Sequence, residues 1–398
     1  MPGPQDTLHD VVVVGARCAG SATARLLAAR GYDVVLLERA ELPSDTLSTH
    51  GILRGGVVQL ARWGLLEQLV AGGAPPVREV VFGSEEGFLR RPVKPAAGVD
   101  HLLAPRRDRL DAVLASAAVV AGARLWTGTT VTGLVRDDGG RVVGVRTRDR
   151  VGRTAQVRAR HVVGADGLRS TVAQQVGART LRCFASDATV FYTYVTGAWP
   201  AFEFHVSEHA FAGVFPTHDA QANVWLSRPA RLLDDVRRAG SRRAVAWRDE
   251  LAATFPALAA AVAAGELTAP VRGCVAPPNF VKQAWGPGWA LVGDAGYHRD
   301  PITGHGITDA FRDAELLAEA LGAALDDPGA ERESLDGYQA ERDRALADTW
   351  RLTRALTRFP SPRRFVELEK ELSGVLEHEA FELASRPAPA GLPAAPAA

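Results

Sequence analysis

The sequence predicts an α/β fold, α+β over the whole chain, in which a nucleotide-binding domain is interrupted by a β-sheet domain and followed by a helical C-terminus. Strand–glycine–helix segments of nucleotide-binding type occur near both ends, starting at Val11 and Leu291. Between them lies a block of short alternating strands, richest in aromatic side chains from 183 to 227. The length of 398 residues exceeds that of one ordinary domain. An inserted domain explains this order.

The first forty residues predict one compact βαβ unit. Residues 11–14 are a β-branched run of buried-strand type, and they lead directly into the loop 15–20. Helix-forming residues follow, and Gly31 stands where a helix C-cap belongs. A second apolar strand, 34–37, ends at Glu38. A glycine loop at a helix N-terminus is typical of a dinucleotide pyrophosphate site, and Glu38 is placed to bind a ribose diol.

Two later segments repeat the pattern of a buried strand that delivers an aspartate into a glycine turn. The first ends in Asp166-Gly167, and the second runs through Gly293-Asp294 into the loop 301–307. A long helix follows this loop, so free N–H groups at its start favour partial negative charge. Asp294 is placed to bind a ribose or ribityl hydroxyl. Three such segments in this order predict one shared dinucleotide site rather than three unrelated turns.

The remaining patterns predict a hairpin over 130–145 and helices over 56–70, 107–121, 231–264, 306–325 and 331–357. Pro256 marks a break or a new start within the span 231–264. From these elements we expect four parts of the chain. They are a nucleotide domain of 8–78, 104–180 and 286–326, a substrate domain of 79–103 and 181–285, a helical region of 327–384 and a disordered tail of 385–398. The tail is rich in proline and alanine, a composition that cannot bury much apolar surface.

Composition narrows the class of protein. The 46 basic and 46 acidic side chains cancel, which argues against nucleic-acid binding. Three widely spaced cysteines predict neither a disulfide framework nor a zinc site, and we expect no metal. No secretory signal opens the sequence, and no apolar run is long enough to span a membrane. We expect a cytoplasmic protein that acts on a small molecule, as a monomer or homodimer.

The three segments together resemble those of the FAD-dependent aromatic hydroxylases, the group A flavoprotein monooxygenases. The resemblance extends to the superfamily that includes geranylgeranyl reductases and flavin-dependent halogenases, and it covers residues 10 to about 325. It implies a discontinuous Rossmann-like FAD-binding domain with bound FAD, NAD(P)H as co-substrate and O2 as oxidant. The implied reaction passes through a flavin C4a-hydroperoxide, so that the cofactor supplies the oxygen chemistry.

By this resemblance the first segment binds the ADP half of FAD. The second contacts the flavin side and is associated with NAD(P)H use, and the third binds the ribityl chain and the isoalloxazine edge. The implied cofactor-binding residues are Gly15, Ala16, Arg17, Gly20, Glu38, Arg39, Arg54, Arg107, Val131, Asp166, Gly167, Gly293, Asp294, Pro301, Gly304, His305, Gly306 and Ile307. Arg107 opens a predicted helix and is the expected contact to the pyrophosphate or ribityl region.

The chain departs from the family pattern at three positions. Arg17 stands for the middle glycine of the G-x-G-x-x-G loop, and His305 and Thr308 stand where glutamine and asparagine are common. FAD binding remains the expectation, with altered contacts to the phosphates and the flavin edge.

Candidates for substrate chemistry come from one loop and from the aromatic-rich strands. His50 follows the second strand on a loop that passes near the flavin in relatives, and histidine exchanges protons near neutral pH. Tyr192 and His205 lie in the strands expected to wall the substrate pocket, with Tyr194 and His209 as further polar groups. A solvated loop histidine, and aromatic side chains that only fill a core, are the alternative interpretations.

Hydroxylation of a small aromatic or polyketide-like compound, in secondary metabolism, is the predicted reaction. A geranylgeranyl-reductase-like saturase is the first alternative. Residues 211–216 are similar to that branch's Tyr-x-Trp-x-Phe-Pro region, although Gly213 replaces the tryptophan. A halogenase is the second alternative, but its Trp-x-Trp-x-Ile-Pro segment and catalytic lysine are not apparent. A flavin-binding regulatory protein without turnover is the third.

Overall fold

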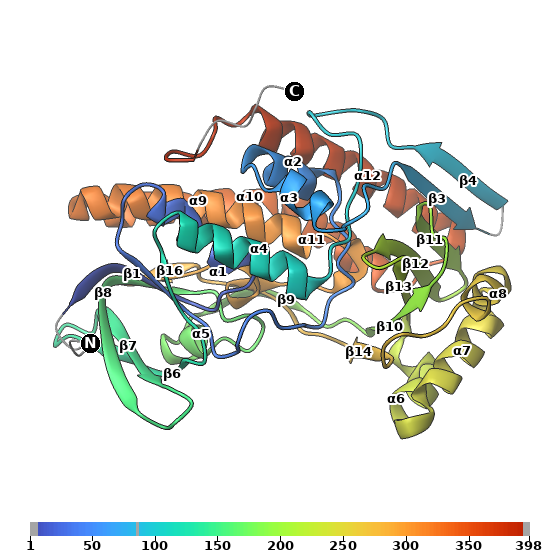
Figure 1. Cartoon of the computed structure of the whole chain (residues 1–398), viewed down its shortest axis with the longest axis horizontal. Coiled ribbons are helices and arrows are strands. Elements are labelled where there is room, and N and C mark those ends of the chain that lie inside the picture. The colour runs from blue at the N-terminus through green and yellow to red at the C-terminus, as the bar shows by residue number, and fades with distance from the viewer. Residues whose placement is uncertain (1–6, 85–86, 393–398) are drawn as a thin grey trace.

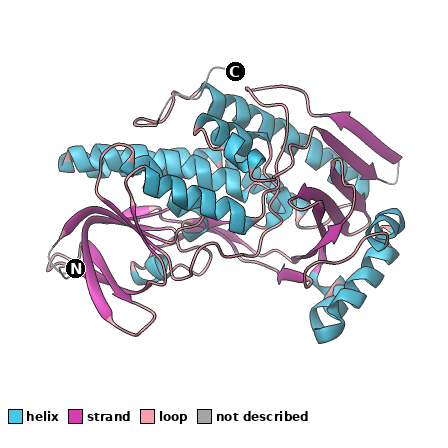
Figure 2. Cartoon of the chain, in the orientation of Figure 1, coloured by secondary structure: helices cyan, strands magenta, loops and turns pink. Residues whose placement is uncertain are grey.

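The structure is a computed structural model that describes residues 7–84 and 87–392. Two large sheets lie toward opposite ends of an elongated molecule, and a layer of helices runs beside both of them (Figure 1). Figure 2 shows the same division by secondary structure, with a separate group of short helices beside the second sheet. No helix in the described ranges combines the length and the apolar character needed to cross a bilayer.

The first sheet contains the predicted βαβ unit. Within the described residues it has eight strands in the order β16-β17-β8-β1-β2-β5, with β7 on β8 and β6 on β7. Their bounds are β1 Leu8–Val14, β2 Val34–Leu37, β5 Arg124–Trp126, β6 Thr130–Arg136, β7 Val142–Arg148, β8 Thr154–Gly164, β16 Trp285–Gly286 and β17 Trp289–Leu291. The parallel register aligns Val14 with Leu37 and Gly164, and Gly164 with Leu291. The C-terminal ends of β1, β2, β8 and β17 therefore meet at one edge, which we call the carboxyl edge.

Helices cover one face of this sheet. They are α1 Cys18–Ala28, α4 Arg107–Val120, α9 Gly306–Asp326 and α10 Glu331–Ala345. Val11 and Val13 pack into the apolar core that these helices form, whereas Val12 and Val14 pack into a second core with side chains of β6 and β7. The central strand β1 is thus covered on both faces, which explains why its sequence is continuously apolar rather than alternating.

The second sheet contains the aromatic-rich strands. Its described strands run in the order β14-β10-β13-β12-β11-β3-β4. Their bounds are β3 Glu79–Ser84, β4 Gly87–Pro92, β10 Ala188–Thr196, β11 Phe202–Ser207, β12 Ala210–Thr217, β13 Gln221–Pro229 and β14 Arg272–Val275. We call the face that carries Tyr192, Tyr194 and Trp225 the inner face, and the face that carries Phe191 and Val224 the outer face.

Different helices cover the two faces of the second sheet. The outer face packs against Trp247 and Leu251 of α7 and their neighbours, and the inner face packs against Phe365 of α12 and other side chains of α11 and α12. The bounds are α6 Asp234–Arg238, α7 Arg243–Thr254, α8 Pro256–Ala263, α11 Ala347–Leu356 and α12 Pro362–Ser385. The C-terminal helices therefore close the inner side of the sheet.

Three predicted helices are each divided in the structure. The span 231–264 forms α6, α7 and α8, with Pro256 in the first turn of α8. The span 56–70 forms α2 (Arg54–Arg62) and α3 (Leu66–Ala71), separated at Gly64, whose φ of +69° is the left-handed conformation that ends helices. The span 331–357 forms α10 and α11, separated at Leu346. The Thr349 hydroxyl donates a hydrogen bond to the Leu346 carbonyl oxygen at 3.1 Å at this break.

A third, small sheet includes a strand of the third predicted nucleotide segment. Its strands are β9 Thr180–Phe184, β15 Asn279–Lys282 and β18 Tyr297–His298, and the short helix α5 spans Thr171–Gln175. After α12 the chain contacts α2 and the helical core of the first sheet: Arg62 of α2 donates to the Pro387 carbonyl oxygen at 2.7 Å, and Leu392 packs against the core that includes α1. The remaining six residues of the expected tail lie outside the described residues.

Candidate cofactor and substrate site

The three predicted nucleotide segments touch one another at the carboxyl edge. Gly15 has a φ of +102°, and a Cβ added there would lie 2.5 Å from the carbonyl oxygen of Ala165 in the second segment. A Cβ added to Gly293 in the third segment would lie 2.8 Å from the Cβ of Ala19. The two pairs are about 150 and 275 positions apart in the sequence, and both contacts lie at the start of α1.

The first glycine loop wraps tightly around the N-terminus of α1. A Cβ on Gly20 would lie 1.8 Å from the Gly15 carbonyl oxygen, so only glycine permits this closeness. The helix begins at Cys18, and its N-cap residue Arg17 makes no side-chain capping bond. The first N–H groups of α1 are thus left for a ligand, which is the arrangement that binds pyrophosphate.

Glu38 lies at the end of β2 and faces the glycine loop. Its buried carboxylate accepts hydrogen bonds from the N–H groups of Ala16 and Ala40, both at 2.9 Å. The Glu38 carbonyl oxygen accepts from the N–H of Thr129, two residues before Val131 on β6. Arg39 is exposed. Glu38, Ala16 and Val131 are therefore grouped beside the loop, as expected for a site that surrounds adenosine.

Arg17 and Arg107 share one buried carboxylate. Arg107 contacts both oxygens of Asp111 at 3.0 Å, and Arg17 contacts the same carboxylate at 3.3 Å. The Cys18 thiol also donates to Asp111, and burial raises the pKa of this thiol far above its usual range. Arg17 thus turns outward from the loop toward Asp111 and Ser44, leaving the loop backbone accessible.

Arg107 is held by Asp111 beside the start of α1 and acts electrostatically on Asp294 of the third segment. Burial opposes its charge, but Cys18, Asp111 and Asp294 raise the pKa of Arg107 overall, so this cation is permanent. The Asp294 residue is exposed at the surface. Desolvation by the protein atoms that surround its carboxylate nevertheless raises the pKa of this group. A permanent cation and an accessible carboxylate at the carboxyl edge match the phosphate and hydroxyl groups of a dinucleotide.

Asp166 has a structural task in the second segment. Its carboxylate accepts from the Ser170 hydroxyl at 2.5 Å and from the N–H groups of Thr171 and Val172 at 2.6 and 3.2 Å. It therefore caps α5, while Gly167 provides the turn with a φ of +77°. Burial raises the pKa of Asp166.

The third segment turns sharply before α9. Gly304 has a φ of +61°; Pro301 and Gly306 are exposed, whereas Gly304 and Ile307 are half-buried. His305 between the glycines is buried, and its Nε2 lies 2.5 Å from Glu379 of α12. The loop thus leaves its glycines at least partly accessible and directs its imidazole into the protein.

These features fit FAD, the cofactor that the sequence resemblance implies. The glycine loop offers free N–H groups where a Cβ would leave no room, Glu38 stands at the end of β2, and Asp294 stands after β17. Arg107 is paired with Asp111 and acts electrostatically on Asp294. Arg54 is placed differently: it is buried, its Nε lies 2.9 Å from Glu377, and it donates to the Val99 carbonyl oxygen at 2.9 Å.

His50 and two tyrosines form a polar cluster on the inner face. His50 Nε2 is hydrogen bonded to the Tyr194 hydroxyl, and the two rings stack with centroids 5.6 Å apart. The Tyr192 hydroxyl accepts from the N–H of Ser48 at 3.2 Å. The Arg106 guanidinium lies 4.1 Å from the Tyr194 ring centroid. The loop before α2 is thus fastened to β10.

Electrostatics keep this cluster uncharged. Burial, then Arg107, Arg106 and His218, lower the pKa of His50 well below its usual range. Burial raises the pKa of Tyr192, and it raises that of Tyr194 above its usual range. Arg107 contributes to the electrostatics of both His50 and Asp294.

His205 lies on the other side of the sheet. Its ring packs between Phe88 and Phe255, with centroids 5.9 and 6.0 Å away, and its Nε2 lies 3.0 Å from Glu203. Phe255 belongs to the outer core. The structure therefore brings His50 and Tyr192 together but places His205 away from them, because neighbouring residues of a strand alternate between faces.

Two residues of the site were not singled out from the sequence. Asp111 follows Arg107 by four positions, the spacing at which helical side chains meet, so this partner was visible in principle. Arg106 gave no such signal, because its stacking on Tyr194 joins residues that are distant in sequence.

Comparisons with known proteins agree with this geometry. The family described as FAD binding domain matches residues 9–353. A digeranylgeranylglycerophospholipid reductase of Methanocella arvoryzae is 28% identical over 356 residues, which cover 85% of this chain and 83% of the relative. PqsL, a probable FAD-dependent monooxygenase of Pseudomonas aeruginosa, superposes with a TM-score of 0.77 at 22% identity, over 92% of this chain and 100% of its own.

The flavin-dependent brominase Bmp2 also has this fold, with a TM-score of 0.78 at 20% identity over 96% of this chain and 97% of its own. Reductases, monooxygenases and halogenases thus share the architecture, as the sequence motifs predicted. Because the family match extends over most of the chain, the protein belongs to the FAD-binding-domain family of flavin-dependent oxidoreductases.

Proposed function

We propose that the protein is an FAD-dependent monooxygenase that uses NAD(P)H and O2 to hydroxylate a small aromatic or polyketide-like compound. The observation that carries the proposal is the uncharged polar cluster of His50, Tyr192 and Tyr194 on the inner face. When bound and reduced, FAD supplies the electrons that activate oxygen. The chain's own residues bind the substrate, exclude water and hold protons.

A neutral imidazole suits a phenolic substrate. The lowered pKa keeps the His50 imidazole neutral even at slightly acidic pH. A neutral imidazole can accept a hydrogen bond or a proton from a substrate hydroxyl. Its Nδ1 is buried and has no hydrogen-bond partner among the described residues. Such an orphan atom costs about 1–3 kcal/mol unless a ligand or water contacts it. A polar substrate group would remove this cost.

The aromatic side chains of the inner face would hold the substrate ring. Phe204, Phe211, Phe215 and Trp225 form a connected set, with centroid distances from 4.9 to 6.5 Å. A Cβ added to Gly51, directly after His50, would lie 2.8 Å from the Phe215 ring. The polar cluster and the aromatic set are therefore adjacent, which suits a substrate with one polar edge.

Reduction of a prenyl chain is the second candidate. A relative named as a digeranylgeranylglycerophospholipid reductase matches over most of both chains. The Trp225 indole also lies over Gly213, where a Cβ would be 2.4 Å from the ring. In the reductase branch a tryptophan stands at the position of Gly213. Here the indole of Trp225, from the neighbouring strand, lies beside that position instead. An apolar chain would pack on such a surface.

One experiment separates these candidates. Purified holoprotein is incubated with NADH or NADPH and a panel of phenols and hydroxynaphthoquinones, while nicotinamide oxidation and O2 uptake are recorded together. Stimulated O2 uptake and a product that contains one added oxygen support hydroxylation. Anaerobic saturation of geranylgeranylated lipid by dithionite-reduced protein, with no aromatic product in air, supports the reductase instead.

A further inference from the structure

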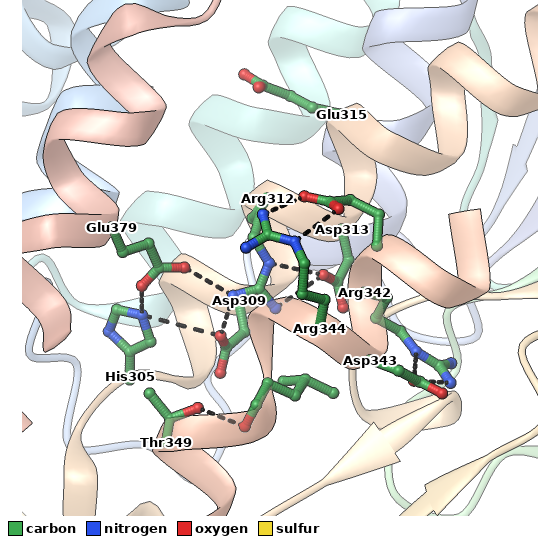
Figure 3. A network of polar contacts seen from close by, with 12 residues as sticks. His305, Asp309, Arg312, Asp313, Glu315, Arg342, Asp343, Arg344, Thr349 and Glu379 are labelled. Carbon is green, nitrogen blue, oxygen red and sulfur yellow. Dashed lines mark hydrogen bonds and ion pairs between the residues drawn. The ribbon is translucent and has the colours of Figure 1, made fainter. Parts of the chain in front are cut away.

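Charged side chains that are buried between α9 and α12 form one network. Figure 3 shows Glu379 of α12 directed at both His305 and Arg312. The Glu379 carboxylate lies 2.7 Å from the Arg312 guanidinium. Asp309 and Asp313 lie 2.8 and 2.9 Å from the same guanidinium. Each of these carboxylates has a cationic partner within the protein, so the network is a structural link between the two helices.

The buried polar side chains of β13 have no such partners. Asn223, Trp225 and Ser227 are 0%, 5% and 2% exposed, and as alternate residues of the strand they face the inner side of the sheet. The amide oxygen and nitrogen of Asn223, Nε1 of Trp225 and the Ser227 hydroxyl lack a hydrogen-bond partner among the described residues. The outward residues between them, Val224 and Leu226, are apolar. We call Asn223, Trp225 and Ser227 the polar row.

Packing alone does not explain the polar row. The strand β13 is covered by side chains on both faces, as is β1, yet residues 11–14 of β1 are apolar without interruption. A buried polar atom without a partner destabilises the fold, and native proteins retain few of them. The polar row therefore indicates that a bound molecule completes these hydrogen bonds.

Asn279 shows how a buried asparagine is bonded when its role is structural. The chain contains only two asparagines, Asn223 and Asn279. The Asn279 side chain is also buried, but its Nδ2 donates to the Pro277 carbonyl oxygen at 3.1 Å. Its Oδ1 accepts from the N–H of Asp300 at 2.6 Å. Asn279 thus joins two segments of the chain, whereas the amide of Asn223 forms no such bond to the described residues.

Asn223 lies beside the polar cluster of His50, Tyr192 and Tyr194. In the sheet it is paired with Tyr194 of β10 on one side and with Phe215 of β12 on the other. Burial raises the pKa of Tyr194 and Asn223 acts in the opposite direction, so the amide is near the phenol, although the contact lacks hydrogen-bond geometry. His50, which is bonded to Tyr194, adds its unpartnered Nδ1 at this end of the polar row.

We propose that Asn223 binds the substrate and makes the inner face selective for an aromatic compound with a carbonyl group beside a hydroxyl group and further oxygen atoms along its length. The amide N–H donates to the carbonyl oxygen, and the amide oxygen accepts from the hydroxyl. Inward residues of a strand repeat about every 6.7 Å, so the polar row extends over about 13 Å, which suits a compound of several fused rings. Trp225 and Ser227 bind its further oxygen atoms.

This inference rests on the proposed function for the place at which substrate binds, and it adds the class of substrate. A prenyl chain has no polar atoms to offer the polar row. The side chain of Asn223 would then remain unpaired in the complex, which costs affinity.

The first measurement is stability without substrate. Asn223→Leu keeps the shape of the side chain and removes both polar ends. Asn279→Leu is the matched control, because it removes an amide whose two ends are bonded. In urea unfolding of the holoprotein we expect the midpoint of Asn223→Leu to equal or exceed that of the wild type, and the midpoint of Asn279→Leu to be lower. An equal loss in both variants would give Asn223 a structural role and overturn the proposal.

The second measurement is binding to the oxidised holoprotein by equilibrium dialysis. The probes are 1,8-dihydroxyanthraquinone, 8-hydroxy-1-tetralone, its parent 1-tetralone, and farnesol as a prenyl compound. We expect the wild type to bind 8-hydroxy-1-tetralone about tenfold more tightly than 1-tetralone, and Asn223→Leu to lose this preference. Trp225→Phe keeps an aromatic ring but lacks the N–H, and it should bind 1,8-dihydroxyanthraquinone about fivefold more weakly.

Three binding results would overturn the proposal. They are a wild type that binds farnesol more tightly than both hydroxylated ketones, a wild type that binds neither ketone because water alone completes the polar row, and a preference for the hydroxyl group that persists in Asn223→Leu. Failure of the proposed hydroxylation is recognised separately. It would leave the stability and binding results standing, because neither NAD(P)H nor turnover enters them.

Discussion

Gly15 and Ala165 are in backbone contact: the position of a Cβ on residue 15 is 2.5 Å from the carbonyl oxygen of Ala165, although 150 residues separate them. This contact joins the first nucleotide segment to the second at the ends of β1 and β8. It makes the glycine obligatory for two reasons, because its φ of +102° also disfavours any other residue.

Gly15→Ala should therefore abolish FAD retention. The added methyl group must displace the backbone of the second segment, and the loop then loses the shape that exposes its N–H groups. Gly31→Ala is the matched control, since Gly31 has a φ of +91° but no atom within 4 Å of the place that a Cβ would take. We expect Gly31→Ala to cost about 1 kcal/mol of stability and to keep its flavin. Flavin absorption per mole of purified protein measures the difference, and equal flavin content would contradict the assignment.

Asp294→Ala should weaken FAD binding by about tenfold to a hundredfold, as loss of a hydrogen bond to a charged group does. Its side chain is accessible at the carboxyl edge and lies within electrostatic reach of Arg107. Equilibrium titration of the apoprotein, followed by flavin fluorescence, provides the dissociation constant. Asp138→Ala, in the exposed turn between β6 and β7, serves as control. An affinity unchanged in both variants would place the ribityl contact elsewhere.

His50→Gln and Tyr194→Phe should both lower kcat/KM by about a hundredfold while flavin content stays constant, because a positioned acid or base contributes about this much. The two groups are hydrogen bonded to each other, so the double variant should be little worse than either single one. His209→Gln changes a half-exposed histidine in the turn between β11 and β12 and should have no effect. Normal turnover in the His50 variant would remove this residue from the chemistry.

Glu369→Gln should stabilise the protein at neutral to alkaline pH. Burial raises the pKa of Glu369 to about 8, and its Oε1 has no hydrogen-bond partner among the described residues. The unfolded chain ionises near its ordinary pKa, whereas the folded protein keeps the proton until about pH 8. Stability from this group is thus present at acidic pH and is lost as pH rises toward 8. Urea unfolding between pH 5 and 9 should show a flatter profile in the variant, and parallel profiles would count against a buried neutral acid.

The sequence predicted the meeting of the three nucleotide segments at one edge of the sheet because its signals are local. The strand 11–14, the loop 15–20 and Glu38 lie within thirty residues, and their spacing alone indicates a βαβ unit. The meeting of Asp166 and Asp294 with this unit also followed, since parallel strands bring their C-terminal ends to one edge. What the pattern did not indicate was that Asp166 caps α5.

The substrate half was less accessible to prediction because it depends on packing between distant segments. Alternation places Phe204 and His205 on opposite faces, but no local signal says which face the helices α7 and α8 will cover. The partnership of His305 with Glu379 joins residues 74 positions apart. Such contacts depend on how the C-terminal helices close the inner face, which periodicity does not encode.

The most direct test of the proposed hydroxylation is turnover by the purified yellow holoprotein under isotopically labelled O2, with NADPH or NADH and a panel of phenols and hydroxynaphthoquinones. We predict that at least one aromatic compound accelerates nicotinamide oxidation and leaves as a product that contains one labelled oxygen atom. Colourless protein that does not take up FAD would contradict the cofactor assignment. Saturation of a prenyl chain without O2, and no labelled product from any aromatic compound, would contradict the proposed hydroxylation.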